Sequence, residues 1–136
     1  MSRPTLSVVG NDHQPRTPNR TVLVVDDDPI QTGQIAMFLQ SQGIEVMTEN
    51  NGYAAVNSIK RLAPAIVVMD VRMPGLDGIE ASTLIAGLNP KPRVILMSGY
   101  PESVFAANRR HTDVFAVIEK PIPLPTLLQF IRRAIG

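Results

Sequence analysis

The sequence has no cysteine among its 136 residues, which excludes disulfide bonds and thiolate metal sites. This absence suits a reducing cytoplasm, where we expect the protein to work. No apolar run approaches the roughly 20 residues that a helix needs to cross a bilayer. The N-terminus lacks the apolar centre of a signal peptide. We therefore expect no membrane partner.

An excess of charge of one sign is also missing. The chain has 13 Lys and Arg against 12 Asp and Glu, a net charge of +1, so no bulk attraction to nucleic acid is implied and we expect none to be bound directly. Hydrophobic residues make up 44% of the chain, which is typical of a globular protein, and the length fits one domain. Residues 1–20 contain three prolines and one short apolar patch. We expect a flexible extension there and a folded domain over 21–136.

Short apolar runs alternate with helical patterns along the folded part. Continuous β-rich runs predict buried strands, and an alternating run predicts an edge strand at 44–48. The other predicted strands are 22–25, 65–69, 94–97 and 114–118. Helices are predicted over 29–42, 53–62, 78–88, 101–110 and from Leu124 to Ile135, with Leu62 and Leu84 among the inward-facing residues. This alternation predicts an α/β fold, a doubly wound sandwich with a parallel five-stranded sheet and helices on both faces.

Polar residues follow the predicted strands at the point where each one ends. Asp26, Asp27 and Asp28 follow the first strand, and Asp70 follows 65–69. Ser98 follows 94–97, and Lys120 follows 114–118 after Glu119. The carboxyl ends of parallel strands lie along one edge of the sheet, where open α/β sheets bind ligands. We therefore expect these side chains to form one site.

The chemistry of this group points to a metal and a phosphoryl group. Two carboxylates about 4 Å apart repel by roughly 4 kcal/mol at an effective dielectric near 20, so a cluster of acids needs a cation. Oxygen ligands suit Mg²⁺, with Mn²⁺ able to substitute. Asp70 would act as a carboxylate nucleophile, while Ser98 and Lys120 would meet phosphoryl oxygens. The sequence predicts a Mg²⁺-dependent phosphoryl acceptor.

Four motifs in order carry a family resemblance. VLVVDDDP, MDVRMPGLDG, LMSGY and EKP, spread over residues 21–136, resemble the receiver domain of bacterial two-component response regulators. The resemblance implies a flavodoxin-like fold with strand order 2-1-3-4-5. It also implies that Asp70 is the phosphoacceptor. Asp26, Asp27 and Asp70 would hold Mg²⁺ together with the backbone carbonyl of Arg72.

Further roles come from the same resemblance. Ser98 and Lys120 match the residues that bind and respond to the phosphoryl group, and the peptide bond between Lys120 and Pro121 is expected to be cis. Arg72 and Tyr100 match positions that flank the phosphoryl group and set its lifetime. We expect the bulky Tyr100 to shield the aspartyl phosphate from water. For Asp28 we expect a helix cap instead of a metal ligand.

The sequence departs from the family at Val117, where receivers commonly carry Tyr or Phe. Phe115 lies two residues earlier, on the same side of the predicted strand. Phe105, Phe115 and Val117 are therefore candidates for the output face, which the resemblance places on the fourth helix, the fifth strand and the last helix. Whether Phe115 replaces the missing aromatic residue is open at this point.

The expected function is phosphorelay signalling. A sensor histidine kinase or a histidine phosphotransfer protein would supply the phosphoryl group, and the phosphorylated domain would switch its binding to a downstream protein. The chain starts with Met1 and stops after the last predicted helix, which favours a stand-alone regulator. Three alternatives stay open: a module of a larger hybrid kinase or regulator, an unphosphorylated interaction module, and a phosphatase. The last is disfavoured because Arg72 stands where such enzymes need a second acid.

Overall fold

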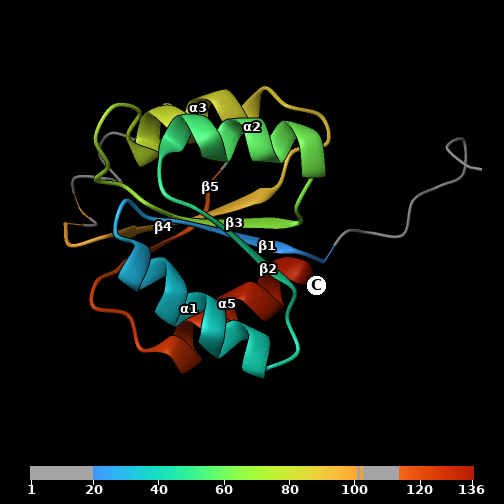
Figure 1. Cartoon of the computed structure of the whole chain (residues 1–136), viewed down its shortest axis with the longest axis vertical. Helices are drawn as coiled ribbons and strands as arrows, with labels where there is room; N and C mark the ends of the chain where they lie inside the picture. The colour runs from blue at the N-terminus through green and yellow to red at the C-terminus, as the bar shows by residue number, and fades with distance from the viewer. Residues whose placement is uncertain (1–19, 101, 103–113) are drawn as a thin grey trace, which may run out of the picture.

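The computed structural model describes residues 20–100, 102 and 114–136. It contains a parallel sheet of five strands in the order β2-β1-β3-β4-β5, flanked by helices (Figure 1). The strands are β1 (Val22–Val25), β2 (Val46–Glu49), β3 (Ile66–Asp70), β4 (Arg93–Ser98) and β5 (Val114–Glu119). The helices are α1 (Pro29–Ser41), α2 (Gly52–Leu62), α3 (Gly78–Ala86) and α5 (Leu124–Ile135). The predicted fold class and strand order are confirmed.

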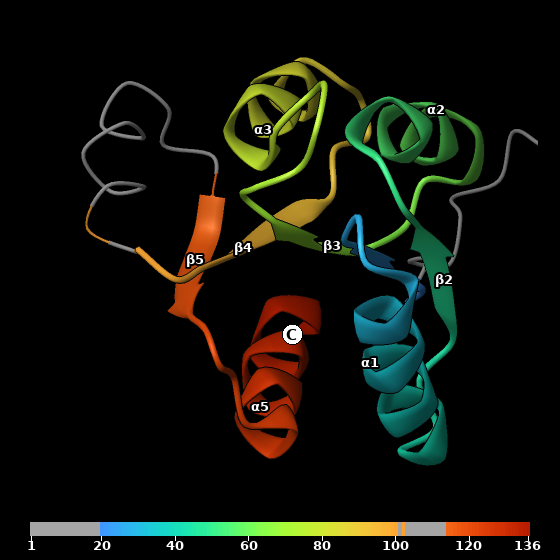
Figure 2. The same ribbon diagram turned by 60° about the vertical axis from the view of Figure 1, so that its left-hand side comes forward.

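The helices form a layer on each face of the sheet. In Figure 2, α1 and α5 lie on one face, and α2 and α3 lie on the other. Each layer closes its own apolar cluster: Ile35, Leu39 and Leu127 pack on one face of the sheet, and Ala55, Ile59 and Ile85 on the other. Strands buried on both faces read as continuous apolar runs, which explains the sequence of β1. No helix in the described residues is long and apolar enough to span a membrane.

Two of the expected inward-facing leucines are exposed. Leu62 is 40% exposed and Leu84 is 50% exposed, so the prediction for both is wrong. Leu62 is the last residue of α2, which ends where Ala63 adopts a left-handed conformation with φ of 48°. In α3, Ala81 and Ile85 already form the buried stripe, and Leu84 lies to one side of it. The predicted helix over 101–110, with Phe105, lies outside the described residues except for Glu102.

Helix caps fix two of the loops at the carboxyl edge of the sheet. The Asp28 carboxylate accepts a hydrogen bond of 2.9 Å from the Ile30 N–H and caps α1. Asp77 caps α3 in a reciprocal capping box with Glu80. The sequence predicted the capping role of Asp28, and the structure confirms it. The two caps fix the backbone at the first turns of α1 and α3.

The edge strand β5 contains an irregularity that the sequence did not predict. Val94 pairs with Val114, but Ile95 pairs with Ala116, so Phe115 is an extra residue on the β5 side. Val114 and Val117 both pack on the cluster beneath α2 and α3. The Phe115 ring is 37% exposed, with the Arg93 guanidinium 5.3 Å from its centre. Val117 therefore packs on the apolar cluster, whereas Phe115 is exposed beside Arg93.

Candidate functional site

Three carboxylates converge at the carboxyl edge of the sheet. Asp26 and Asp27 follow β1, and Asp70 is the last residue of the neighbouring strand β3. One carboxylate oxygen from each of the three residues lies within 4.8 Å of the others. Asp26 and Asp70 are only 2% and 7% exposed, whereas Asp27 is exposed. The topology thus brings together the acids that the sequence singled out.

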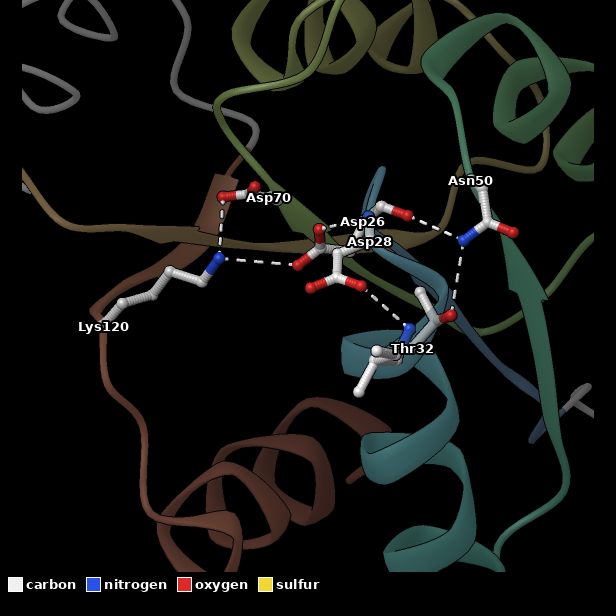
Figure 3. Close-up of polar contacts among 7 residues, drawn as sticks. Asp26, Asp28, Thr32, Asn50, Asp70 and Lys120 are labelled. Carbon is white, nitrogen blue, oxygen red and sulfur yellow. Dashed lines mark hydrogen bonds and ion pairs between the residues drawn. The ribbon is translucent and has the colours of Figure 1, made fainter.

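Lys120 provides the positive charge beside these acids. Its Nζ lies 3.4 Å from Asp26 Oδ2 and 3.3 Å from Asp70 Oδ1 (Figure 3). The backbone N–H of Lys120 donates to the Ser98 carbonyl at 2.8 Å, which continues the pairing of β4 and β5 past the end of β5. The next peptide bond, to Pro121, is cis. The lysine side chain therefore enters the cluster from the end of the edge strand.

Burial and charge shift the pKa values of two of these groups. Burial raises the pKa of Asp26 above its ordinary value; the hydrogen bond from the Asp28 N–H opposes this, the Asp70 charge adds to it, and Lys120 opposes it. Burial lowers the pKa of Lys120, but the charges of Asp70 and Asp26 outweigh that effect, so the net shift is upward. Removing the proton from Asp26 therefore costs more than it does in water, and Lys120 offsets this cost only in part. An additional cation would offset it.

Two further predicted residues border the cluster. Ser98, the last residue of β4, is 3% exposed, and its Oγ accepts a hydrogen bond of 2.9 Å from the Tyr100 N–H. Tyr100 is 58% exposed, and the Arg72 guanidinium lies 4.9 Å from the centre of its ring. Arg72 and Tyr100, which follow neighbouring strands, therefore contact each other at the edge where the acids lie.

The residues present fit a magnesium ion. The cluster offers hard oxygen ligands from three carboxylates, which Mg²⁺ prefers, and Lys120 offsets only part of their negative charge. Asp27 is exposed, so water molecules can reach this end of the cluster. The acidic cluster is therefore compatible with Mg²⁺ binding.

Sequence reasoning missed a polar group behind the acids. Asn50 Nδ2 donates a hydrogen bond of 2.8 Å to the Asp26 backbone carbonyl and one of 3.3 Å to Thr32 Oγ1 (Figure 3). Asn50 lies between β2 and α2, while Thr32 lies in the first turn of α1. No motif marks Asn50, because its role depends on two contacts with distant parts of the chain.

Two glycines hold the loop that follows the predicted phosphoacceptor. A Cβ on Gly78 would lie 2.5 Å from the Asp70 carbonyl oxygen and 2.8 Å from Val71 Cα. A Cβ on Gly52 would lie 2.5 Å from the Leu76 carbonyl oxygen. Each contact is too short for a Cβ, so only glycine fits at the first residues of α2 and α3 unless the backbone shifts. The loop between β3 and α3 is therefore packed against two helix starts.

Comparison with known proteins agrees with this geometry. The family model for the response regulator receiver domain matches residues 22–132. The chain is 31% identical over 117 residues to the autoinducer 1 sensor kinase/phosphatase LuxN of Vibrio harveyi, covering 85% of this chain and 13% of LuxN. It is 32% identical over 114 residues to the regulatory protein AtoC of Escherichia coli, covering 84% of this chain and 25% of AtoC. The chain thus spans a quarter or less of the length of these two relatives.

A solved structure of a receiver domain is also similar to this chain. The receiver domain of NtrX from Brucella abortus is 30% identical, with a TM-score of 0.75 over 84% of this chain and 97% of that one. Sequence, fold and the order of the polar residues along the sheet edge all point to one family. The chain belongs to the response regulator receiver domains, the signalling domains of two-component systems.

Proposed function

We propose that Asp70 accepts a phosphoryl group from a phosphohistidine, carried by a sensor kinase or a histidine phosphotransfer protein. The observation that carries this proposal is the cluster itself: three carboxylates with oxygens within 4.8 Å of one another, and Lys120 Nζ 3.3 Å from Asp70 Oδ1. Such an arrangement suits the transfer of a highly charged group, where positioning and charge stabilisation provide most of the catalysis.

The transfer step uses Asp70 as the nucleophile. A carboxylate oxygen of Asp70 forms a bond to phosphorus as the bond between phosphorus and the histidine nitrogen breaks. The electron pair of that bond returns to the imidazole nitrogen, and the histidine leaves neutral because its ring takes a proton from water or already carries one on the second nitrogen. Asp70 suits this role because it ends β3 with its carboxylate at the open edge, while Asp26 is held through its backbone and side chain.

The proposed cofactor is Mg²⁺, with Mn²⁺ able to substitute. Asp26, Asp27, Asp70 and the backbone carbonyl of Arg72 would hold it, and it would supply positive charge to the phosphoryl oxygens. Lys120 would leave its contact with Asp70 and meet a phosphoryl oxygen. The buried Ser98 hydroxyl would donate a hydrogen bond to another oxygen.

Phosphorylation would then act by shifting a population of conformations. The phosphoryl group binds best to the conformer in which Ser98 and Lys120 both reach it, so its presence biases the equilibrium toward that conformer. Val117 lacks the aromatic ring that commonly reports this change, so the output would depend on other residues of β5. Phe115, exposed and next to Arg93, is the described candidate.

The donor would approach over α1. This helix, Pro29–Ser41, contains no charged residue, and it exposes Ile30 by 69% and Met37 by 73%. A groove of about 380 Å³ lies beside it, lined by α1 residues and by the segment from Lys120 into α5. An uncharged helix next to Lys120 suits docking of an apolar surface that presents a histidine to Asp70.

The context of the domain is part of the proposal. LuxN and AtoC are much longer than this chain, so a stand-alone regulator, which we favour, and a module of a larger protein would both contain the same domain. A cytoplasmic location fits either context. The domain would catalyse only its own phosphorylation and dephosphorylation. An unphosphorylated interaction module is the alternative that direct measurement must exclude.

The deciding experiment is the intact mass of the protein after incubation with Mg²⁺ and acetyl phosphate, a small phosphoryl donor. We expect one added phosphoryl group in the wild type and none in Asp70→Asn, which keeps the size of the side chain. Lys120→Met should greatly slow the reaction, while Lys60→Met, an exposed lysine in the last turn of α2, should not. If the wild type stays unmodified with both acetyl phosphate and a phosphohistidine protein, the interaction module becomes the better reading.

A further inference from the structure

We infer that Asn50 is a positioning residue for the magnesium site, acting on the backbone of Asp26 without itself contacting the ion. This inference rests on the proposed function, because it concerns how the acidic pair is held for Mg²⁺. The relevant contacts are the two hydrogen bonds from Asn50 Nδ2, to the Asp26 carbonyl at 2.8 Å and to Thr32 Oγ1 at 3.3 Å.

Asp26 is held through each of its polar groups. Its N–H donates to the Glu49 carbonyl at 3.2 Å, and its Oδ1 accepts from the Asp28 N–H at 3.0 Å. Its Oδ2 lies 3.4 Å from Lys120 Nζ. The remaining group is the backbone carbonyl, and Asn50 is the residue that donates to it. Asn50 therefore completes the set of contacts that orient this buried carboxylate.

The position of Asn50 follows from where the sheet pairing stops. The β1–β2 register runs to the pair Val25 and Glu49, after which the chain turns into α2. In a parallel ladder, the next donor to the Asp26 carbonyl would be a backbone N–H of the neighbouring strand. Here the Asn50 side chain supplies that donor. One side-chain hydrogen bond thus extends the sheet by one residue beside the acidic pair.

Thr32 connects the same amide to α1. Thr32 is 3% exposed, and its hydroxyl donates to the Pro29 carbonyl at 3.1 Å while it accepts from Asn50. The first turn of α1 and the end of β1 are therefore held to one amide group. Asp27 and Asp28 lie between these two fixed points, so the backbone that carries the exposed Asp27 carboxylate is restrained at both ends.

The two contacts require a side chain that donates two hydrogens. The Asp26 carbonyl can only accept, and the Thr32 hydroxyl already uses its hydrogen on Pro29, so both partners need a donor. Asn and Gln supply an NH₂ group with two hydrogens, whereas a leucine of similar shape to asparagine supplies none. A side chain that only filled space at position 50 would therefore tolerate leucine, and a positioning residue would not.

The test is the Mg²⁺ affinity of the full chain, measured by isothermal titration calorimetry without a phosphoryl donor. We expect Asn50→Leu to bind Mg²⁺ about three- to tenfold more weakly, as the loss of one neutral hydrogen bond implies. Asn50→Gln keeps the donor and should stay within about twofold of the wild type. The control is Asn51→Leu, which removes the α2 cap on the Ala54 N–H and should leave the affinity unchanged.

A second readout needs no metal. Amide hydrogen exchange followed by NMR reports local opening, and two N–H groups in the restrained segment are informative: Asp28, bonded to Asp26 Oδ1, and Thr32, bonded to the Asp28 carbonyl. In the metal-free protein, Asn50→Leu should increase exchange at these two positions. Asn51→Leu should instead increase exchange in the first turn of α2.

The results separate two kinds of failure. If the wild type binds Mg²⁺ and Asn50→Leu binds it equally well, the positioning role is overturned while the proposed function stands. A general loss of exchange protection throughout Asn50→Leu, with Asn50→Gln equally weakened in Mg²⁺ binding, would also overturn it in favour of a purely structural role. If the wild type itself binds no Mg²⁺, the proposed function fails and this inference fails with it.

Discussion

The Arg72 guanidinium lies 4.9 Å from the centre of the Tyr100 ring, so the side chains that follow β3 and β4 meet at the carboxyl edge of the sheet. A cation beside an aromatic face is stabilised by about 0.5–1 kcal/mol at an exposed site. The pair borders the edge where Asp70 lies. The contact with Arg72 restrains the Tyr100 ring, which we expect to shield the proposed aspartyl phosphate from water.

We therefore predict faster hydrolysis of the aspartyl phosphate when the pair is broken. Tyr100→Ala should lose its phosphoryl group about two- to fivefold faster than the wild type, the range that one such contact implies. Arg72→Ala should also speed hydrolysis. The double variant should hydrolyse at the rate of the single variants, because each single change already removes the same contact. A time course of intact mass after removal of the donor measures the rate.

The control for this prediction is Phe115→Ala. It breaks the similar pair with Arg93, which lies at the other end of β4, away from the acids. Its hydrolysis rate should match the wild type. A Tyr100→Ala rate no faster than that of Phe115→Ala would show that the ring does not protect the phosphoryl group.

Gly78 gives a second prediction, on stability. A Cβ there would meet the Asp70 carbonyl oxygen at 2.5 Å, so Gly78→Ala must push α3 away from the end of β3. We expect a loss of about 1–3 kcal/mol in the free energy of unfolding, measured by urea titration, together with slower phosphorylation of Asp70. Gly33 in α1 is the matched control, since no described atom outside its own helix lies within 4 Å of a Cβ there. Gly33→Ala should stabilise the protein by about 0.5–1 kcal/mol, and equal effects of the two variants would contradict the argument.

A third prediction concerns pH. The pKa of Asp26 is raised above its ordinary value of 3.8, so the folded state holds this proton more tightly than the unfolded state. Its contribution to stability is fully present below pH 3.8 and is lost as the pH rises through the folded-state pKa. In metal-free protein, Asp26→Asn should therefore be more stable than the wild type at neutral pH, by about 0.5–2 kcal/mol. The difference should shrink as the pH falls toward 3.8.

Urea unfolding in a chelator at several pH values measures this difference. Asp28→Asn is the control, because asparagine caps a helix as well as aspartate does and Asp28 is exposed. Excess Mg²⁺ should reverse the order by stabilising only the wild type. If the difference in unfolding free energy between Asp26→Asn and the wild type does not vary with pH, burial of the charged carboxylate is not its cause.

The uncharged surface of α1 leads to a fourth prediction. Ile30→Lys and Met37→Lys replace exposed apolar side chains and should leave phosphorylation by acetyl phosphate unchanged. Transfer from a phosphohistidine protein should fall about tenfold or more, as expected when a charge is placed in a desolvated contact. Tyr53→Lys, at an exposed residue of α2, is the control and should affect neither reaction. If Ile30→Lys, Met37→Lys and Tyr53→Lys all accept the phosphoryl group from the phosphohistidine protein at the same rate, the donor does not dock on α1.

Much of the fold could be predicted from the sequence because the central strands are short continuous apolar runs. The runs at Val22–Val25 and Ile66–Asp70 are buried on both faces, so their apolar content alone predicts central strands. The polar residues that end the strands follow from topology, since a parallel sheet places all carboxyl ends on one edge. The acidic cluster and Lys120 were therefore predictable as neighbours, although their distances were not.

The parts that were missed depend on contacts between distant segments. Asn50 has no motif because its partners, Asp26 and Thr32, lie 24 and 18 positions away in the sequence. The exposure of Leu84 depends on which face of α3 packs on the sheet, since its neighbour Ile85 is buried. The irregularity at Phe115 depends on how β5 pairs with β4, which composition does not encode. Local patterns set the elements, and tertiary contacts set these details.

The contact between Lys120 and Asp26 joins residues that are 94 positions apart. A ribosome adds about 5–20 residues per second, so the acids emerge several seconds before the lysine. During that interval the growing chain has the carboxylates but neither β5 nor the cation that accompanies them. The site is thus complete only once the chain has grown past Lys120, so a shorter chain would lack the cation of the proposed phosphoryl site.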